Sequence, residues 1–248
     1  SNTSIGAFAL YTNTTGTNNT ASGRYSLRGN TTGSFNTASG YGSLKSNTTG
    51  GSNTATGYEA LKFNLTGSNN TASGRRALYT NTTGHSNTAS GYRALYLNTT
   101  GYKNTASGYG SLTANTTGNF NTGTGWKVLK NNTTGHSNTA SGYYALRSNS
   151  TGTKNIGLGY GAGDGITTGS NNTVIGDLAG TSTMADTVLI GAGTTERLKI
   201  DASGLSINGS ALALGATNIN GLTDGYNVGN SVGLGTGALA NDDGTDNR

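Results

Sequence analysis

The sequence repeats itself at an interval of seventeen residues. The Asn of an Asn-Thr-Ala-Ser-Gly motif, or of a close variant of it, returns at this spacing in eleven units without an insertion. These asparagines are Asn2, Asn19, Asn36, Asn53, Asn70, Asn87, Asn104, Asn121, Asn138, Asn155 and Asn172. A fixed period of this kind means that each unit has one shape and contacts its neighbours in one way. The fuller unit is N-T-A-S-G-Y-x-A-L-x-x-N-T-T-G-x-x, and its positions are numbered from the Asn.

Glycine recurs at two positions of the unit. Position 15 is glycine from Gly16 to Gly169, and position 5 is glycine in every unit. The position-5 glycines are Gly6, Gly23, Gly40, Gly57, Gly74, Gly91, Gly108, Gly125, Gly142, Gly159 and Gly176. Glycine suits a positive φ or a close approach of two backbones, and an N-T-T-G run is typical of a turn. We interpret the two glycines as the corners of one coil.

The period predicts an all-β fold, a parallel β-solenoid or β-roll with one coil per unit. The segments T-A-S-G and Y-x-A-L between the corners are too short for helices and contain β-branched and aromatic residues. Helix-pair repeats need about 33 residues. At ~4.8 Å per coil, eleven coils form an elongated rod segment of about 50 Å. Ala or Ser at position 8 and Leu at position 9 are predicted to face inward. The Leu row is Leu10, Leu27, Leu44, Leu61, Leu78, Leu95, Leu112, Leu129 and Leu146.

The composition predicts an oligomer. Only 31% of the residues are hydrophobic, and proline and cysteine are absent. One large aliphatic side chain per coil buries too little apolar area to offset the entropy lost when a coil is ordered. Hydrogen-bond ladders must therefore contribute, and association is favoured, so we expect a homo-oligomer.

Without cysteine there are no disulfides or thiolate metal sites. No apolar run is long enough for a membrane span, and no cofactor is expected.

Changes in the repeat divide the chain into three predicted parts. Residues 1–193 form the solenoid array, with regular units to about residue 182 and a more apolar composition towards its end. Residues 194–225 break the period and are predicted to form a connector of short strands. Residues 226–248 begin a second array, because the motif returns there as N-S-V-G-L-G-T-G-A-L. The chain begins with Ser1 rather than Met, which favours a piece of a longer fibre.

These motifs resemble known fibre proteins. The unit N-T-A-S-G-Y-x-A-L-x-x-N-T-T-G resembles the repeats of phage and prophage tail-fibre proteins and, more loosely, the β-roll head repeats of trimeric autotransporter adhesins. The segment E-R-L-K-I-D-A-S-G-L-S-I-N-G, residues 196–209, is similar to tail-fibre connectors. The resemblance covers most of the chain. It implies a trimeric, elongated fibre that is extracellular, on a cell surface or a virion, and it carries over no catalytic residues.

Position 4 departs from the adhesin pattern. Adhesin heads usually have an aliphatic residue there, whereas eight units of this chain have Ser or Thr. Those residues are Ser22, Ser39, Thr56, Ser73, Ser90, Ser107, Thr124 and Ser141. Either the interior of the coil is partly polar, or position 4 faces outward.

Charge and aromatic residues predict a binding stripe. Residues 1–160 contain twelve Lys or Arg but one acid, Glu59, for a net charge of +11, whereas the remainder has −6. Stacked coils turn positions 6, 7 and 10 into longitudinal rows. Basic rows interleaved with aromatics fit an anionic polysaccharide or cell-surface glycan, a lipopolysaccharide, or a nucleic acid. Of these ligands, nucleic acid is the least expected. The interpretation that the sequence alone favours is Tyr packed between subunits, with Lys and Arg keeping the rod soluble, and ligand binding is the alternative. The candidate stripe is Tyr41, Tyr58, Arg75, Arg76, Tyr92, Arg93, Tyr109, Trp126, Lys127 and Tyr143.

Other candidate sites have simpler interpretations. The N-x-T/S sequons at position 12 would lie only ~5 Å apart in stacked coils, so a stacked Asn ladder is preferred to glycosylation. They are Asn13, Asn30, Asn47, Asn64, Asn81, Asn98, Asn115, Asn132 and Asn149. His85 and His136 are three coils apart and are interpreted as surface residues rather than metal ligands. The run Asn241, Asp242, Asp243 and Asp246 is interpreted as a solvated turn rather than a Ca²⁺ site.

The sequence therefore favours a structural protein over an enzyme. No catalytic constellation is visible, because the regular array offers almost no carboxylates for acid–base work. The leading hypothesis is a fibre segment that serves as a shaft and binds a receptor or surface glycan. One alternative is a self-assembling extracellular filament or sheath. Another is ice binding through a Thr ladder at position 13, composed of Thr14, Thr31, Thr48, Thr82, Thr99 and Thr116.

Overall fold

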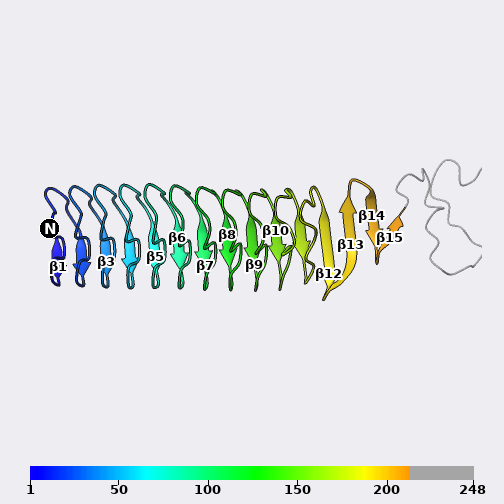
Figure 1. Cartoon of the computed structure of the whole chain (residues 1–248), viewed down its shortest axis with the longest axis horizontal. Helices are drawn as coiled ribbons and strands as arrows, with labels where there is room; N and C mark the ends of the chain where they lie inside the picture. The colour runs from blue at the N-terminus through cyan, green and yellow to red at the C-terminus, as the bar shows by residue number, and fades with distance from the viewer. Residues whose placement is uncertain (213–248) are drawn as a thin grey trace, which may run out of the picture.

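The protein is an elongated stack of β-coils (Figure 1). The computed structural model describes residues 1–212, and this part contains fifteen strands in one sheet, ordered β1 to β15 along the chain, and no helix. The predicted parallel β-solenoid with its seventeen-residue spacing is confirmed. The predicted second array, residues 226–248, and the end of the predicted connector lie outside the described residues.

Each unit contributes one three-residue strand, at positions 2 to 4. These strands are β1 (Thr3–Ile5), β2 (Thr20–Ser22), β3 (Thr37–Ser39), β4 (Thr54–Thr56), β5 (Thr71–Ser73), β6 (Thr88–Ser90), β7 (Thr105–Ser107), β8 (Thr122–Thr124), β9 (Thr139–Ser141), β10 (Ile156–Leu158) and β11 (Thr173–Ile175). Neighbouring strands are parallel and pair equivalent repeat positions, as in Thr20↔Thr37 and Ser22↔Ser39. Side chains alternate across a strand. Position 3 is therefore buried in β2–β11, whereas positions 2 and 4 face outward.

The core is narrow and built from small residues. The position-9 leucines from Leu27 to Leu146 are fully buried, as the sequence predicted, and the position-8 residues beside them are buried too. The third core row is position 3, mostly alanine such as Ala38 and Ala89, which the sequence analysis did not place inside. Since position 3 points inward, position 4 points outward, and this settles the open question about its polar side chains.

The Y-x-A-L segment is not a strand, contrary to the expectation from its composition. Positions 6 to 11 form consecutive tight turns in which positions 7 and 9 are left-handed, for example Glu59 at φ 55° and Leu61 at φ 51°. The backbone amides of these two left-handed residues point in opposite directions along the stack. The Glu59 amide donates to Tyr41 O in the preceding coil at 2.9 Å, and the Leu61 amide donates to Ala77 O in the following coil at 3.0 Å. The turns thus keep inter-coil hydrogen bonds without extended backbone.

The two glycine corners have different causes. Position-5 glycines have a positive φ, such as 123° at Gly40, and a Cβ there would lie 2.7 Å from Gly57 O in the next coil. Position-15 glycines have no positive φ. A Cβ on Gly50 would lie 2.6 Å from Asn47 Oδ1 and would also meet the carbonyl oxygen of Gly67, so close approach excludes a side chain. The left-handed residue at this corner is at position 17 instead.

Two ladders of buried asparagines line the corner at position 15. At position 12, Asn81 Nδ2 donates to Asn64 Oδ1 at 2.7 Å and to Gly84 O at 2.9 Å. At position 1, Asn70 Nδ2 donates to the same Gly84 O at 2.9 Å. The predicted Asn ladder at position 12 is confirmed, while the position-1 ladder was not anticipated. Buried amides are costly unless hydrogen-bonded, and here each one joins its own coil to the next.

The stack ends in antiparallel strands. The last parallel pair joins β11 to β12 (Val188–Ala192), with Thr173 opposite Val188 in a coil that is two residues shorter than the regular unit. β12 then pairs antiparallel with β13 (Thr195–Asp201), with a register shift between Ile190 and Gly191. The strands β14 (Gly204–Ile207) and β15 (Ser210–Leu212) complete the antiparallel end.

Candidate binding surface

Positions 6, 7 and 10 come together along one edge of the solenoid. Because position 5 turns the chain away from the strand, the next residues project from this edge in every coil. Contacts link all three rows: the Arg93 guanidinium at position 7 lies 5.3 Å from the Tyr92 ring at position 6 and 5.0 Å from the Tyr96 ring at position 10. We call the side chains at these three positions in residues 24–160 the aromatic–basic ridge. It contains every residue of the predicted stripe.

Aromatic rings on the ridge stack along the axis. At position 6, the Tyr41 and Tyr58 rings have centroids 5.3 Å apart with an interplanar angle of 10°, and Tyr109 and Trp126 are 4.1 Å apart at 9°. The stack continues through Tyr143 to Tyr160. Arg75 bridges the one break, because its guanidinium lies 5.7 Å from the Tyr58 ring and 5.8 Å from the Tyr92 ring.

This stacking determines what the aromatics offer to a ligand. Neighbouring rings are stacked with centroids between 4.1 and 6.4 Å apart, and their side chains stay partly exposed, as at Tyr109 with 41% and Trp126 with 40%. Sugars and bases that stack on aromatic residues need an open ring face. Because each stacked ring is turned towards its neighbours, the ridge offers less open ring face than an isolated aromatic side chain would.

The cations of the ridge mostly lack acidic partners. Among residues 1–212, the ridge has three ion pairs with carboxylates: Lys62 and Arg76 with Glu59, at 2.7 and 2.9 Å, and Arg147 with Asp164, at 2.9 Å. Cations in neighbouring coils, ~4.8 Å apart, repel one another by about 1 kcal/mol in water and by more where they are partly buried. The cations without a carboxylate partner in this part of the chain are Arg24, Arg28, Lys45, Arg75, Arg93, Lys127 and Lys130.

Glu59 is the one carboxylate inside the basic part of the ridge. Burial alone would raise its pKa, but hydrogen bonds and charge from Lys62 and Arg76 outweigh burial, so the pKa lies below its usual value. The pKa of Lys62 is correspondingly raised, because its pairing with Glu59 outweighs its own burial. Glu59 therefore acts as an internal counterion for two cations.

Arg93 occupies the same position as Arg76, one coil later, without such a counterion. Arg76 Nε donates to Glu59 Oε2 at 2.9 Å in the coil before it. The equivalent neighbour of Arg93 is Arg76 itself, which is a cation. Within the described residues, Arg93 Nε is the buried side-chain nitrogen that has no hydrogen-bond partner. The ridge thus contains a donor for which residues 1–212 supply no acceptor.

A second surface, formed by positions 2 and 4 of the strands, has the opposite character. From β2 to β9 it carries only Thr and Ser, all exposed except the half-buried Ser141, and no charged or aromatic residue. At the ends it becomes apolar: Ile5, Ile156 and Leu158 are exposed to 65%, 45% and 50%. We call this surface, from β1 to β12, the strand face. Its neutral and uniform composition contrasts with the variable ridge.

The Thr row proposed for ice binding is already engaged. Thr31 Oγ1 donates to Thr48 O at 3.0 Å, and Thr82 Oγ1 donates to Thr99 O at 2.9 Å. Position 13 therefore links coils through its hydroxyl donors. The outward array of hydroxyls lies on the strand face instead, a row that the sequence analysis did not single out for this role.

The remaining candidate residues stay apart. His85 is exposed and stacks on Tyr102 with ring centroids 5.0 Å apart, and His136 is exposed in a coil three units later. Within residues 1–212 there is no cluster of three or more His, Cys, Asp or Glu side chains. The acidic run from Asn241 to Asp246 lies outside the described residues.

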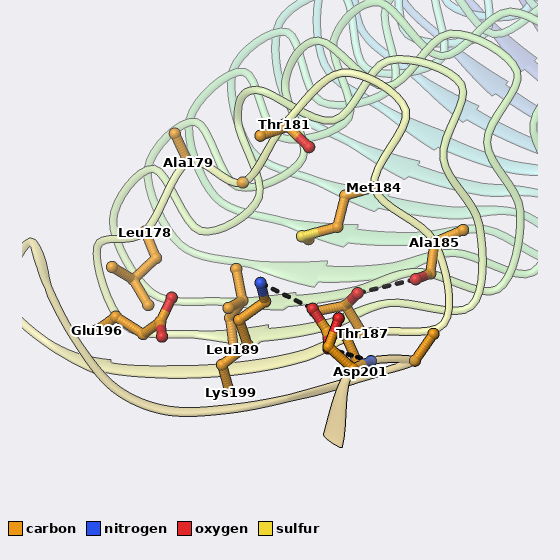
Figure 2. A pocket seen from close by; sticks show the side chains of 13 residues that line it. Leu178, Ala179, Thr181, Met184, Ala185, Thr187, Leu189, Glu196, Lys199 and Asp201 are labelled. Atoms are coloured by element: carbon orange, nitrogen blue, oxygen red, sulfur yellow. Dashed lines mark hydrogen bonds and ion pairs between the residues drawn. The ribbon is translucent and has the colours of Figure 1, made fainter. Parts of the chain in front are cut away.

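A hollow of about 510 Å³ marks the end of the core (Figure 2). Leu178, Met184 and Leu189 line it together with Glu196, Lys199 and Asp201 of β13. At its rim, Lys199 pairs with Asp201 at 2.7 Å. This ion pair is internal to β13, and the hollow lies beside the shortened last coil, where Leu178 and Met184 are less completely buried than the leucines of the regular coils.

Comparisons with known proteins gave no match. No family model, no curated protein and no solved structure matches the chain. In the described part of the chain, no helix has the length and hydropathy needed to cross a membrane.

Proposed function

We propose that this protein is a non-catalytic shaft segment of an extracellular fibre, as in tail fibres or adhesins, and that identical copies associate through the strand face into a trimer. The observation that carries the proposal is the composition of this face. Twelve parallel strands, β1 to β12, present the same two outward rows, which stay uncharged throughout and become apolar at the ends of the array. An in-register copy would place hydroxyls against hydroxyls and Ile or Leu against Ile or Leu.

Exposed apolar side chains at β10 support association at that end. Ile156 and Leu158 share one surface of the same strand and are about half exposed. β11 and β12 extend this surface with half-buried Ile175 and Ile190. Such contiguous apolar surface on a protein is typical of an interaction site. The core has little apolar area per coil, so covering this surface would add stability that one chain lacks.

The test is the mass of the protein in solution. Light scattering coupled to size exclusion is expected to give three times the chain mass for the wild type. Thr105→Arg combined with Leu158→Arg buries two charges in the proposed contact and is expected to give monomers. The matched control is Thr117→Arg with Thr168→Arg, which adds the same charge at exposed position 14 and leaves the trimer intact. A monomeric wild type, or an unaffected Thr105→Arg/Leu158→Arg variant, contradicts the proposal.

Ice binding is a second candidate, supported by the same face. Its Thr and Ser hydroxyls form a regular outward array along β2–β9, but ice and a second copy cannot occupy this surface together. A monomeric protein with thermal hysteresis that Thr105→Arg/Leu158→Arg removes would favour ice binding over the shaft. The filament alternative predicts a mass that keeps growing with concentration in the light-scattering experiment.

A further inference from the structure

We infer that the aromatic–basic ridge binds a linear acidic polysaccharide, with the polymer lying parallel to the long axis of the rod. The ridge is a different surface from the strand face, because positions 6, 7 and 10 follow the position-5 corner. The inference therefore goes beyond the shaft function and does not depend on the oligomeric state.

Charge complementarity is the first argument. Seven ridge cations between Arg24 and Lys130 have no carboxylate partner among residues 1–212. They are held in line by the stacked coils rather than dispersed around the rod. Like charges in a row disfavour the folded state, and a chain of anions laid along them removes the repulsion and releases bound counterions.

The unpaired nitrogen of Arg93 is the second argument. At Arg76 the Glu59 carboxylate accepts a hydrogen bond from Nε. At Arg93 the same donor is buried without an acceptor in the described structure, between the Tyr92 and Tyr96 rings. A carboxylate or sulfate of the polymer, after a small shift of this side chain, supplies at Arg93 what Glu59 supplies at Arg76. An anionic group is required, because a neutral sugar hydroxyl would not offset the charge.

The stacked rings decide between acidic polysaccharide and nucleic acid. Proteins that bind single strands stack bases on open aromatic faces. On this ridge the ring faces lie against one another, with Tyr109 and Trp126 at 4.1 Å and Tyr143 and Tyr160 at 5.2 Å. A base therefore meets less open ring face on this ridge than on such a binding platform. Tyr hydroxyl edges beside Arg and Lys can instead hydrogen-bond the hydroxyls and anionic groups of a sugar chain.

The experiment measures binding of fluorescent alginate and dextran sulfate to the full chain, with neutral dextran and a single-stranded oligonucleotide as comparison probes. The wild type is expected to bind both anionic polysaccharides, to bind them at least tenfold more weakly at about 200 mM than at about 50 mM salt, and not to bind dextran. Arg93→Gln with Lys127→Gln is expected to weaken binding at least tenfold.

The matched control removes the same charge from the other end of the strands. Lys103→Gln with Lys154→Gln changes position 17, which precedes the strand, and is expected to weaken binding less than threefold. Equal losses in the two double variants would reduce the effect to net charge and overturn the inference. So would the absence of polysaccharide binding, or an oligonucleotide that binds more tightly than alginate and is equally sensitive to Arg93→Gln/Lys127→Gln. Light scattering on the same variants gives their mass in solution, so the proposed trimer is tested separately from polysaccharide binding.

Discussion

At the scale of single residues, the coil depends on backbone conformations that most side chains avoid. Left-handed residues other than glycine recur at positions 7, 9 and 17, as at Arg93, Leu95 and Ser86. Each left-handed residue costs on the order of 1–2 kcal/mol. The hydrogen bonds that its backbone amide donates to a neighbouring coil offset this cost. Glycine is obligatory only where the next coil leaves no room for a Cβ. Comparison of the eleven units with one another reflects this distinction: position 7 holds many residue types, whereas position 5 is always glycine.

Two nearby glycines test this distinction. Gly40→Ala places a Cβ 2.7 Å from Gly57 O. This change is expected to cost about 3 kcal/mol, because strain and overpacking act together. At Gly42 the φ is 63°, and a Cβ would meet its nearest neighbour, Glu59 Cγ, at 3.7 Å. Gly42→Ala is therefore expected to cost about 1 kcal/mol, from the backbone strain alone. Urea denaturation followed by circular dichroism measures both, and equal losses would refute the assignment of position 5 to close backbone approach.

The Asn ladder makes a second residue-scale prediction. Asn81→Ala removes hydrogen bonds to Asn64 Oδ1 and Gly84 O and one from Asn98 Nδ2. The Gly84 carbonyl oxygen still accepts a hydrogen bond from Asn70 Nδ2, and Asn98 Nδ2 still donates to Gly101 O. Asn64 Oδ1, in contrast, is left buried and without a donor. The expected loss, measured by urea denaturation, is about 2–3 kcal/mol. Thr83→Ala, exposed two residues away, is the control and is expected to change stability by less than ~0.5 kcal/mol. A harmless Asn81→Ala would show that the ladder contributes little.

At the scale of the element, one coil is hydrogen-bonded to its neighbours around most of its circumference, although only three of its seventeen positions form a strand. The Asn corner and the Thr row bond to equivalent positions in neighbouring coils, and the turn amides bond to carbonyl groups one position earlier in the unit. A coil therefore has no stable existence alone. Its stability comes from the copies above and below it, as in other solenoids.

The period and the Leu row of the coil could be predicted from the sequence, because they depend only on recurrence and burial. The turn structure of Y-x-A-L could not, because β-propensity at Tyr58 and Leu61 is overridden by amide bonds to neighbouring coils, which no local pattern records. The inward direction of Ala55 was missed for a related reason: a three-residue strand is too short to display an alternation. The ridge could be predicted as rows, but not that ring stacking would cover the faces of its aromatics.

Glu59 provides the pH test at this scale. Its pKa is lower in the folded than in the unfolded chain. Its ion pairs therefore contribute stability that is present above pH ~4.5 and is lost as pH falls through the folded pKa. Glu59→Gln is expected to be less stable than wild type at pH ~7, and the difference is expected to shrink below pH ~4.5. Thermal denaturation of both proteins between pH ~3 and ~7 measures the gap. A gap that stays constant across this range would contradict the role of Glu59 as a counterion.

At the scale of the whole molecule, the coils add up to a rod whose two long surfaces differ in chemistry. The strand face is uncharged along its length and carries only Thr and Ser from β2 to β9, whereas the ridge is basic and variable in sequence. A rod built this way can associate along one side and present charge along another. Its length is set by the number of units, because each coil contacts only its neighbours and can be removed without changing the others.

The most direct measurement is the length of the rod after four whole units are removed. Deleting residues 71–138 joins Asn70 to Thr139 in the same register, so every remaining coil keeps its contacts. At ~4.8 Å per coil, small-angle X-ray scattering is expected to show a maximum dimension shorter by about 19 Å, with an unchanged cross-sectional radius of gyration. A particle that keeps its length, thickens or unfolds after this deletion would contradict the seventeen-residue coil as the unit of the structure.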